Sequence, residues 1–130
     1  MEPSRRHGKL VYLASPYTHA DKAVEASRYR AVLLAWRWLI DNNRDFHFFV
    51  PIVQSHQLCA SGDVPVEWHF WADFDGTMLS KCEQLWALCI PGWRDSVGVR
   101  AERRMAEELG LPVRFLLPDG RAYLVLEEEP

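Results

Sequence analysis

The chain has 130 residues, of which 48% are hydrophobic and 25% charged, and its formal net charge is -3. This is a globular composition, and the length predicts a single domain over residues 1–130 with a real core. The slightly acidic balance excludes the broad basic surface that general nucleic-acid binding needs, so we expect a small-molecule ligand.

The sequence also predicts where the protein works. It has no apolar stretch as long as a signal-peptide core or a membrane span, so we expect a cytoplasmic protein that does not associate with membranes. The three cysteines, Cys59, Cys82 and Cys89, are odd in number and lack C-x-x-C spacing. They therefore predict reduced, mostly buried thiols rather than a disulfide framework or a zinc knuckle.

The first segments of the chain predict a buried strand and a helix. Residues 9–14 (KLVYLA) are apolar, β-branched and aromatic, and Pro16 stops the strand. A helix begins near Thr18 or Asp21, since either side chain can cap it. Apolar residues then recur at helical spacing, and we interpret them as core: Ala31, Leu34, Ala35, Trp38 and Leu39.

The middle of the chain predicts a strand, a long loop and a second helix. Residues 46–52 (FHFFVPI) predict the strand, and Pro51 places its end at or near a sheet edge. Residues 53–66 show no period and are rich in turn-forming types, so we expect a loop of the kind that often carries function. Residues 67–82 predict a helix whose apolar side chains are spaced for burial: Trp68, Trp71, Phe74, Met78 and Leu79.

The last third of the chain completes an α/β pattern. Residues 85–90 are apolar throughout, as in a central parallel strand covered on both faces. A turn and a helix ending at Gly110 follow, and residues 113–117 and 122–126 predict a fourth strand and an antiparallel edge strand. This order implies a three-layer α/β/α sandwich with a flavodoxin-like parallel sheet. Neither common nucleotide fingerprint of such domains is present, and no cofactor is implied.

Glu102 is the candidate around which a site is expected. In open α/β sheets, ligands bind beyond the carboxyl ends of the strands, and the helix carrying Glu102 starts there. Gly98 lies four positions earlier, so Glu102 faces the same side as the turn. Judged on spacing alone, a solvated glutamate favoured by the helix dipole is the simpler interpretation.

A metal site is a weaker hypothesis. His69 and Asp73 are one helical turn apart, and His56 is a further candidate ligand for metal-dependent hydrolysis. No third ligand has convincing spacing, so we expect no metal.

Four segments carry a resemblance to a known family: YLASPYTH at residues 12–19, PIVQSH at 51–56, the helix with Asp75, and PGWRDSVGVRAE ending at Glu102. Together, and in this order along roughly the whole chain, they resemble an uncharacterised bacterial and phage family of the nucleoside 2-deoxyribosyltransferase-like superfamily. The resemblance implies cleavage or transfer at the N-glycosidic bond of a nucleoside or nucleotide.

The resemblance also implies roles for individual residues. Cleaving this bond develops positive charge at the sugar C1′ and negative charge on the base, so a site needs a carboxylate under the sugar and a proton donor by the base. Glu102 is the expected nucleophile and Asp75 the proton donor or relay. Tyr12 is expected to hold Glu102 by a phenol hydrogen bond, while backbone N–H groups of the helix N-terminus keep the carboxylate ionised.

Further residues are expected around the substrate. Trp93 is the candidate for stacking on the base, and the remaining binding positions are Ala14, Ser15, Pro16, Tyr17, His56, Ser96 and Gly98. His19, His56 and His69 are expected along the rim. Arg28, Arg94 and Arg100 are the candidates for contacting a phosphate.

Three alternatives stay open at this point: hydrolysis, transfer between bases, and a non-catalytic nucleotide-binding or sensing module on the same fold. The transferases often have an acidic residue two places before the glycine of G-x-x-x-E, where this chain has Ser96. Their pocket is completed by a neighbouring subunit. Six tryptophans in a chain of this size also predict a homodimer or larger homo-oligomer.

Overall fold

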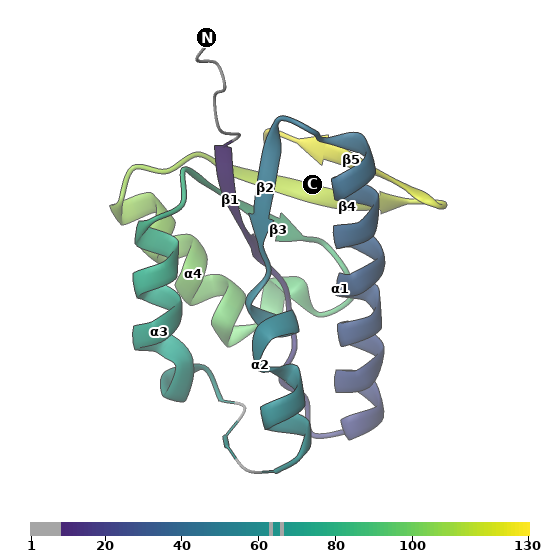
Figure 1. Cartoon of the computed structure of the whole chain (residues 1–130), viewed down its shortest axis with the longest axis vertical. Helices are drawn as coiled ribbons and strands as arrows, with labels where there is room; N and C mark the ends of the chain where they lie inside the picture. Colours follow the sequence, from purple (N-terminus) through teal and green to yellow (C-terminus); the bar gives the residue numbers. More distant parts are fainter. Residues whose placement is uncertain (1–8, 63, 66) are drawn as a thin grey trace, which may run out of the picture.

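The computed structural model describes residues 9–62, 64–65 and 67–130, and within them five strands form one sheet (Figure 1). The strand order is β2-β1-β3-β4-β5, with the first four parallel and β5 antiparallel to β4. The strands are β1 (Lys9–Ala14), β2 (Phe46–Phe49), β3 (Gln84–Leu88), β4 (Val113–Asp119) and β5 (Ala122–Leu126). The order is the flavodoxin-like one, and the predicted α/β class and antiparallel edge strand are confirmed.

Helices cover both faces of this sheet (Figure 1). α1 (Lys22–Asn42) covers one face, while α3 (Trp68–Ser80) and α4 (Val97–Glu108) pack together on the other. α2 (Pro51–Ala60) continues from β2 past the carboxyl ends of the strands and packs beside α1. A short 3-10 turn, η1 (Trp93–Asp95), lies between β3 and α4.

Alternation along β1 decides which of its side chains reach each core. Successive side chains of a strand point to opposite faces, so Val11 and Leu13 pack with the α1 core. Tyr12 and Ala14 pack on the other side, in the core that α3 and α4 build. Tyr12 therefore lies on the face where α4 presents Glu102.

The prediction for residues 46–66 was wrong in its second half. The strand ends at Phe49; Pro51 and Ile52, predicted as its end, open α2, which continues to Ala60 where a loop was expected. Proline is well suited to that position because the N–H it lacks has no partner inside the helix anyway. β2 is an edge strand, as predicted. Residues 63 and 66 of the predicted loop lie outside the described residues, as do residues 1–8, where no targeting segment was expected.

Two helical predictions need correction at single positions. Leu34 of α1 is 62% exposed, and Val32 is buried with Ala35 and Leu39 in its place. Phe74 of α3 is 38% exposed, because the buried stripe of that helix runs through Asp75 and Leu79. A hydrophobic stripe predicted from the spacing of apolar residues can thus be rotated by about one residue relative to the buried face of the helix.

Other expectations about the chain are met. Of the two proposed caps of α1, Asp21 is the one used, and its side chain accepts from the backbone N–H of Ala23 at 2.9 Å. The three cysteines are free and buried, as predicted. Within the described residues, no helix is both long enough and apolar enough to cross a membrane.

Candidate functional site

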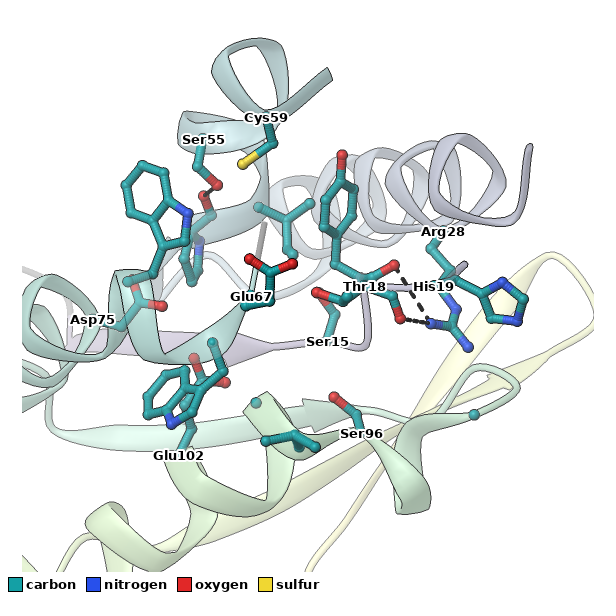
Figure 2. A pocket seen from close by; sticks show the side chains of 18 of the residues that line it. Ser15, Thr18, His19, Arg28, Ser55, Cys59, Glu67, Asp75, Ser96 and Glu102 are labelled. Carbon is teal, nitrogen blue, oxygen red and sulfur yellow. Dashed lines mark hydrogen bonds between the residues drawn. The ribbon is translucent and has the colours of Figure 1, made fainter. Parts of the chain in front are cut away.

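A cavity of about 480 Å³ opens at the carboxyl end of the parallel strands (Figure 2). Its walls come from the loop after β1, from α1, α2 and α3, and from the β3–α4 connection with the first turns of α4. This is the edge of the sheet where ligands bind in open α/β folds. Both Asp75 and Glu102 line the cavity.

Glu102 is held by Tyr12 in the floor of this cavity. The Tyr12 hydroxyl donates to Oε2 of Glu102 at 2.6 Å, a short distance typical of a hydroxyl that donates to a carboxylate. Tyr12 is fully buried and Glu102 is 6% exposed, so the bond lies away from solvent. The phenol hydrogen bond expected from the sequence is therefore present.

Burial shifts the pKa of both carboxyl groups upward. Desolvation raises the pKa of Asp75 to about 6. For Glu102, desolvation is again the largest cause, the Tyr12 hydrogen bond opposes it, the charge of Asp75 adds to it, and the pKa is raised to about 8. The same two carboxylates, after burial, raise the pKa of Tyr12 well above its usual value, so this phenol stays protonated. Asp75 and Glu102 are thus an electrostatically coupled pair that holds one proton near neutral pH.

The expectation that the α4 N-terminus keeps Glu102 ionised was wrong. α4 begins at Val97, so Glu102 lies beyond its first turn. The helix N-terminus is capped by Ser96, whose side chain accepts from the N–H of Val99 at 3.2 Å and whose carbonyl accepts from Arg100. The dipole acts within the first turn, and at the position of Glu102 desolvation dominates.

Four of the predicted binding residues do line the cavity: Ser15, Tyr17, Ser96 and Gly98. Ser15 is 8% exposed, and its Oγ has no hydrogen-bond partner in the described part of the chain. A buried hydroxyl without a partner is costly, so a polar ligand atom in the cavity would gain a bond at this point.

Four other predicted binding residues lie elsewhere. Ala14 and Pro16 are fully buried behind the cavity. His56 is outside the cavity lining and hydrogen-bonded to Tyr17. Trp93 is turned to the opposite side of the β3–α4 connection, where its ring packs against Phe115 with centroids 5.7 Å apart. It is therefore a core residue and not a stacking platform for a ligand.

The aromatic wall of the cavity comes instead from α3. Trp68 and Trp71 both line it, and a Cβ added at Gly98 would lie 3.9 Å from the Trp68 ring. The opposite wall belongs to α2, and four of its residues line the cavity without having been predicted as site residues: Pro51, Ile52, Ser55 and Cys59. Ser55 and Cys59 follow Pro51 at intervals of four, a helical signal that was available in the sequence.

One of the three candidate arginines reaches the cavity. Arg28 lines it, and its Nη1 donates to the carbonyl oxygens of Tyr17 at 3.4 Å and Thr18 at 3.0 Å. Arg94 instead pairs with Glu129 at 3.3 Å, and Arg100 is exposed on α4. In Figure 2, Arg28 lies toward one end of the cavity and Asp75 toward the other.

Two of the three histidines expected along the rim reach the cavity. His19 and His69 line the cavity rim as expected. Among the residues that the structure describes, no group of three or more His, Cys, Asp or Glu side chains is arranged to hold an ion. The weaker hypothesis of hydrolysis through His56, His69 and Asp73 therefore finds no geometric support.

Comparison with known proteins identifies a family. A family model described as "Domain of unknown function (DUF1937)" matches residues 9–117. No curated protein sequence matches the chain. The matched range runs from β1 into β4, and it contains Tyr12, Asp75 and Glu102. Because the match covers well over half of its length, the chain belongs to the DUF1937 family.

Proposed function

We propose that the protein cleaves the N-glycosidic bond of a nucleoside or nucleotide, by hydrolysis or by transfer, with Glu102 as the nucleophile. The observation that carries this proposal is the buried Glu102 carboxyl group, which accepts from Tyr12 at 2.6 Å and lines a cavity together with Asp75. The resemblance of YLASPYTH and PGWRDSVGVRAE to the nucleoside 2-deoxyribosyltransferase-like superfamily gives the same assignment.

Each step of this reaction has a group to perform it. The Glu102 carboxylate attacks C1′ and forms a glycosyl ester, while the bond from C1′ to the base breaks. Asp75 gives its proton to the departing base nitrogen. Water or the nitrogen of a second base then attacks C1′ and loses its proton to Asp75, and Glu102 leaves as a carboxylate. The Tyr12 hydroxyl orients Glu102 throughout and stabilises its charged form.

The reaction needs the two coupled carboxyl groups to share one proton. With pKa values of about 6 and about 8, the pair holds one proton between these two values. Because the pKa of Glu102 is the higher one, the proton lies mainly on Glu102, and the reactive arrangement, with the proton on Asp75 and the charge on Glu102, is the minor form. Positive charge developing at C1′ favours this arrangement, because it lies against the Glu102 carboxylate.

The cavity walls fit the two ends of such a substrate. Trp68 and Trp71 are on α3, the helix that carries Asp75, so a base stacked there lies near its proton donor. The Ser15 hydroxyl and Arg28 offer polar contacts for the sugar and its substituent. The cavity volume of about 480 Å³ is within the usual range for small-molecule sites.

The first experiment is a panel of nucleosides and nucleoside 5′-monophosphates incubated with the protein, with free base separated by chromatography. We expect base release from at least one member. Glu102→Gln should abolish release and keep ligand binding, because the amide has nearly the same shape but is no nucleophile. Asp75→Asn should slow release by about 10²–10⁴-fold, most strongly for bases that leave poorly.

A glycosyl ester on Glu102, seen as a mass increase on the intact protein, would support the nucleophilic role directly. Release that continues unchanged in Glu102→Gln would remove Glu102 from the mechanism. Binding of panel members by calorimetry with no release under any condition would favour the nucleotide-sensing alternative over an enzyme.

A further inference from the structure

α2 forms one wall of the cavity but is anchored by few buried side chains. Four of its residues line the cavity: Pro51, Ile52, Ser55 and Cys59. Only Pro51 and Cys59 are buried, the N-terminus has no side-chain cap, and Leu58 is 50% exposed. Helices in proteins are held mainly by packing of a buried face, so the position of α2 must depend on other contacts as well.

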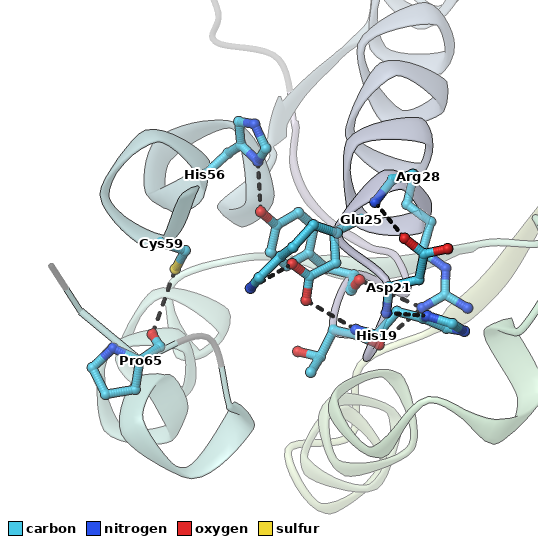
Figure 3. A network of polar contacts seen from close by, with 11 residues as sticks. His19, Asp21, Glu25, Arg28, His56, Cys59 and Pro65 are labelled. Atoms are coloured by element: carbon cyan, nitrogen blue, oxygen red, sulfur yellow. Dashed lines mark hydrogen bonds and ion pairs between the residues drawn. The ribbon is translucent and has the colours of Figure 1, made fainter. Parts of the chain in front are cut away.

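His56 supplies contacts of that kind. Its Nδ1 lies 2.6 Å from the hydroxyl oxygen of Tyr17, in the loop between β1 and α1 (Figure 3). Its ring stacks on Tyr29 of α1, with ring centroids 3.8 Å apart and planes 10° from parallel. The same ring meets the Tyr17 ring edge-on at 5.5 Å. One imidazole therefore joins α2, α1 and the β1–α1 loop.

The backbone of Tyr17 contacts α1. Its carbonyl oxygen accepts from Arg28 of α1, and so does that of Thr18. The Tyr17 ring lines the cavity, whereas its hydroxyl points to His56. The hydrogen bond to His56 then fixes the orientation of the Tyr17 ring.

The Tyr17 hydroxyl needs a hydrogen-bond acceptor at this position. Burial, followed by the charge of Glu25, raises the pKa of Tyr17 to about 12, so the phenol keeps its proton and donates it. In the imidazole tautomer that carries its proton on Nε2, Nδ1 of His56 accepts this bond. Among the described residues, His56 is the hydrogen-bond partner of this hydroxyl. Loss of the acceptor leaves a partly buried hydroxyl without its partner, which disfavours the present placement of both Tyr17 and α2.

We propose that His56 is a positioning residue that fixes the α2 wall of the cavity against Tyr17. It acts through the Tyr17 ring on one side and through α2 on the other, and so sets the width of the cavity between Tyr17 and Ile52. It does not line the cavity itself. This inference deepens the proposed function, but only its kinetic test rests on that function.

The first test needs no ligand, because Cys59 reports the position of α2. Its buried thiol lies on the cavity side of that helix. His56→Phe keeps a ring to stack on Tyr29 but has no acceptor, so we expect Ellman's reagent to label Cys59 roughly tenfold faster. Labelling of Cys82 and Cys89, followed by peptide mass spectrometry, should stay unchanged, since both lie in the core away from α2.

The matched rescue is Tyr17→Phe combined with His56→Phe. The double variant has no hydroxyl that needs an acceptor, so its Cys59 labelling should return to within about threefold of the natural protein. Equal acceleration at all three cysteines would mean general loosening of the fold and would overturn the proposal. Unchanged Cys59 labelling in His56→Phe, or a double variant as fast as the single one, would overturn it too.

The second test uses the nucleotide panel. His56→Phe should raise KM for base release by about tenfold and leave kcat within about threefold, because a misplaced wall weakens binding and not chemistry. His56→Gln, whose amide oxygen can accept from Tyr17, should recover most of the KM. A fall in kcat at constant KM would contradict a positioning role. If the natural protein releases no base, the proposed function fails, and the labelling test still decides the role of His56.

Discussion

The Tyr12 hydroxyl donates to Oε2 of Glu102 at 2.6 Å, between a strand and a helix whose residues are 90 positions apart. The bond exists because Tyr12 is on the α3 and α4 side of β1 and because α4 turns Glu102 inward to the carboxyl end of the sheet. It lowers the pKa of Glu102 against the larger effect of burial. Removing this hydrogen bond should therefore change the fraction of molecules with an ionised Glu102 and the pH dependence of activity.

Tyr12→Phe should lower kcat/KM for base release by roughly 10–100-fold, since an unpaired buried carboxylate loses a charge-assisted bond. The pKa of Glu102 should rise further above about 8, because the hydrogen bond that lowers it is gone. Rates measured from acid to alkaline pH will show whether the alkaline limb has moved upward. An unchanged profile would mean that Tyr12 does not act on Glu102 in catalysis.

The pH dependence of kcat/KM should be bell-shaped, with limbs near the pKa values of about 6 and about 8. Below the first value both carboxyl groups are protonated and no nucleophile exists. Above the second both are ionised and no acid is left. When one proton is bound, a pH-independent fraction of the molecules carries it on Asp75. The two limbs of the profile therefore report the pKa values of the pair and not of one residue each.

Asp75→Asn is the matched control for that profile. With no carboxyl group at this position, the alkaline limb should disappear and the rate should only rise with pH. The midpoint should fall below about 8, because the charge of Asp75 raises the pKa of Glu102. A bell that survives this substitution would assign the acid to another residue.

Glu102→Gln should make the fold more stable at alkaline pH. The pKa of Glu102 is raised from 4.5 to about 8, so the folded state binds this proton more tightly than the unfolded state. The stabilisation is complete below the unfolded pKa and is lost as pH rises through about 8. Glutamine never ionises and still accepts from Tyr12, so it avoids this loss.

Thermal unfolding should show a higher Tm for Glu102→Gln at about pH 9, on the order of 10 °C, and little difference at about pH 4. Glu108→Gln, at an exposed position of the same helix, is the control and should show neither effect. A variant less stable than the natural protein at alkaline pH would mean that ionisation of Glu102 does not destabilise the fold.

Gly92→Ala should destabilise the fold by more than backbone strain alone. Gly92 has φ of 92°, and an added Cβ would lie 2.3 Å from Nη2 of Arg28, so the guanidinium must move. Gly110→Ala is the control, since its φ is 74° but open space surrounds the new atom. We expect roughly 1–2 kcal/mol for Gly110→Ala and clearly more for Gly92→Ala by denaturant unfolding. Equal costs would show that Arg28 adapts freely.

Trp68→Leu and Trp93→Leu should separate binding from stability. Trp68 lines the cavity, so its loss should weaken binding of a panel nucleotide by roughly 10–100-fold in calorimetry. Trp93 is packed against Phe115 and lies under Arg94 and Arg103, so its loss should lower Tm instead. A binding loss confined to Trp93→Leu would restore the stacking role first given to it.

Much of the fold follows from local patterns in the sequence. The continuous apolar run at residues 85–90 predicted the central strand, because only a strand covered on both faces tolerates such a run. α2 was missed because its large apolar residues, Ile52, Val53 and Leu58, form no buried stripe, and only Pro51 and Cys59 of the helix are buried. Without a wide apolar stripe, the proline at its start was taken as the end of a strand.

The candidate site was predictable where the backbone alone determines direction. Tyr12 faces Glu102 because strand alternation leaves a side chain only two directions. Trp93 had no such constraint, since it follows Gly92 with its positive φ, and the turn sends the ring to the Phe115 side. Trp68 and Trp71 were expected only as core, because helical spacing does not tell a core from a cavity wall.

The 90-residue separation of Tyr12 and Glu102 also bears on how the chain acquires its chemistry. The bond needs β1 to lie beside β3 in the sheet, a pairing that closes the long segment between residues 14 and 84. Closing long loops is slow compared with forming helices, so α3 and α4 can be assembled before this strand arrives. If the proposed activity relies on Tyr12, it should not appear during refolding before β1 has docked.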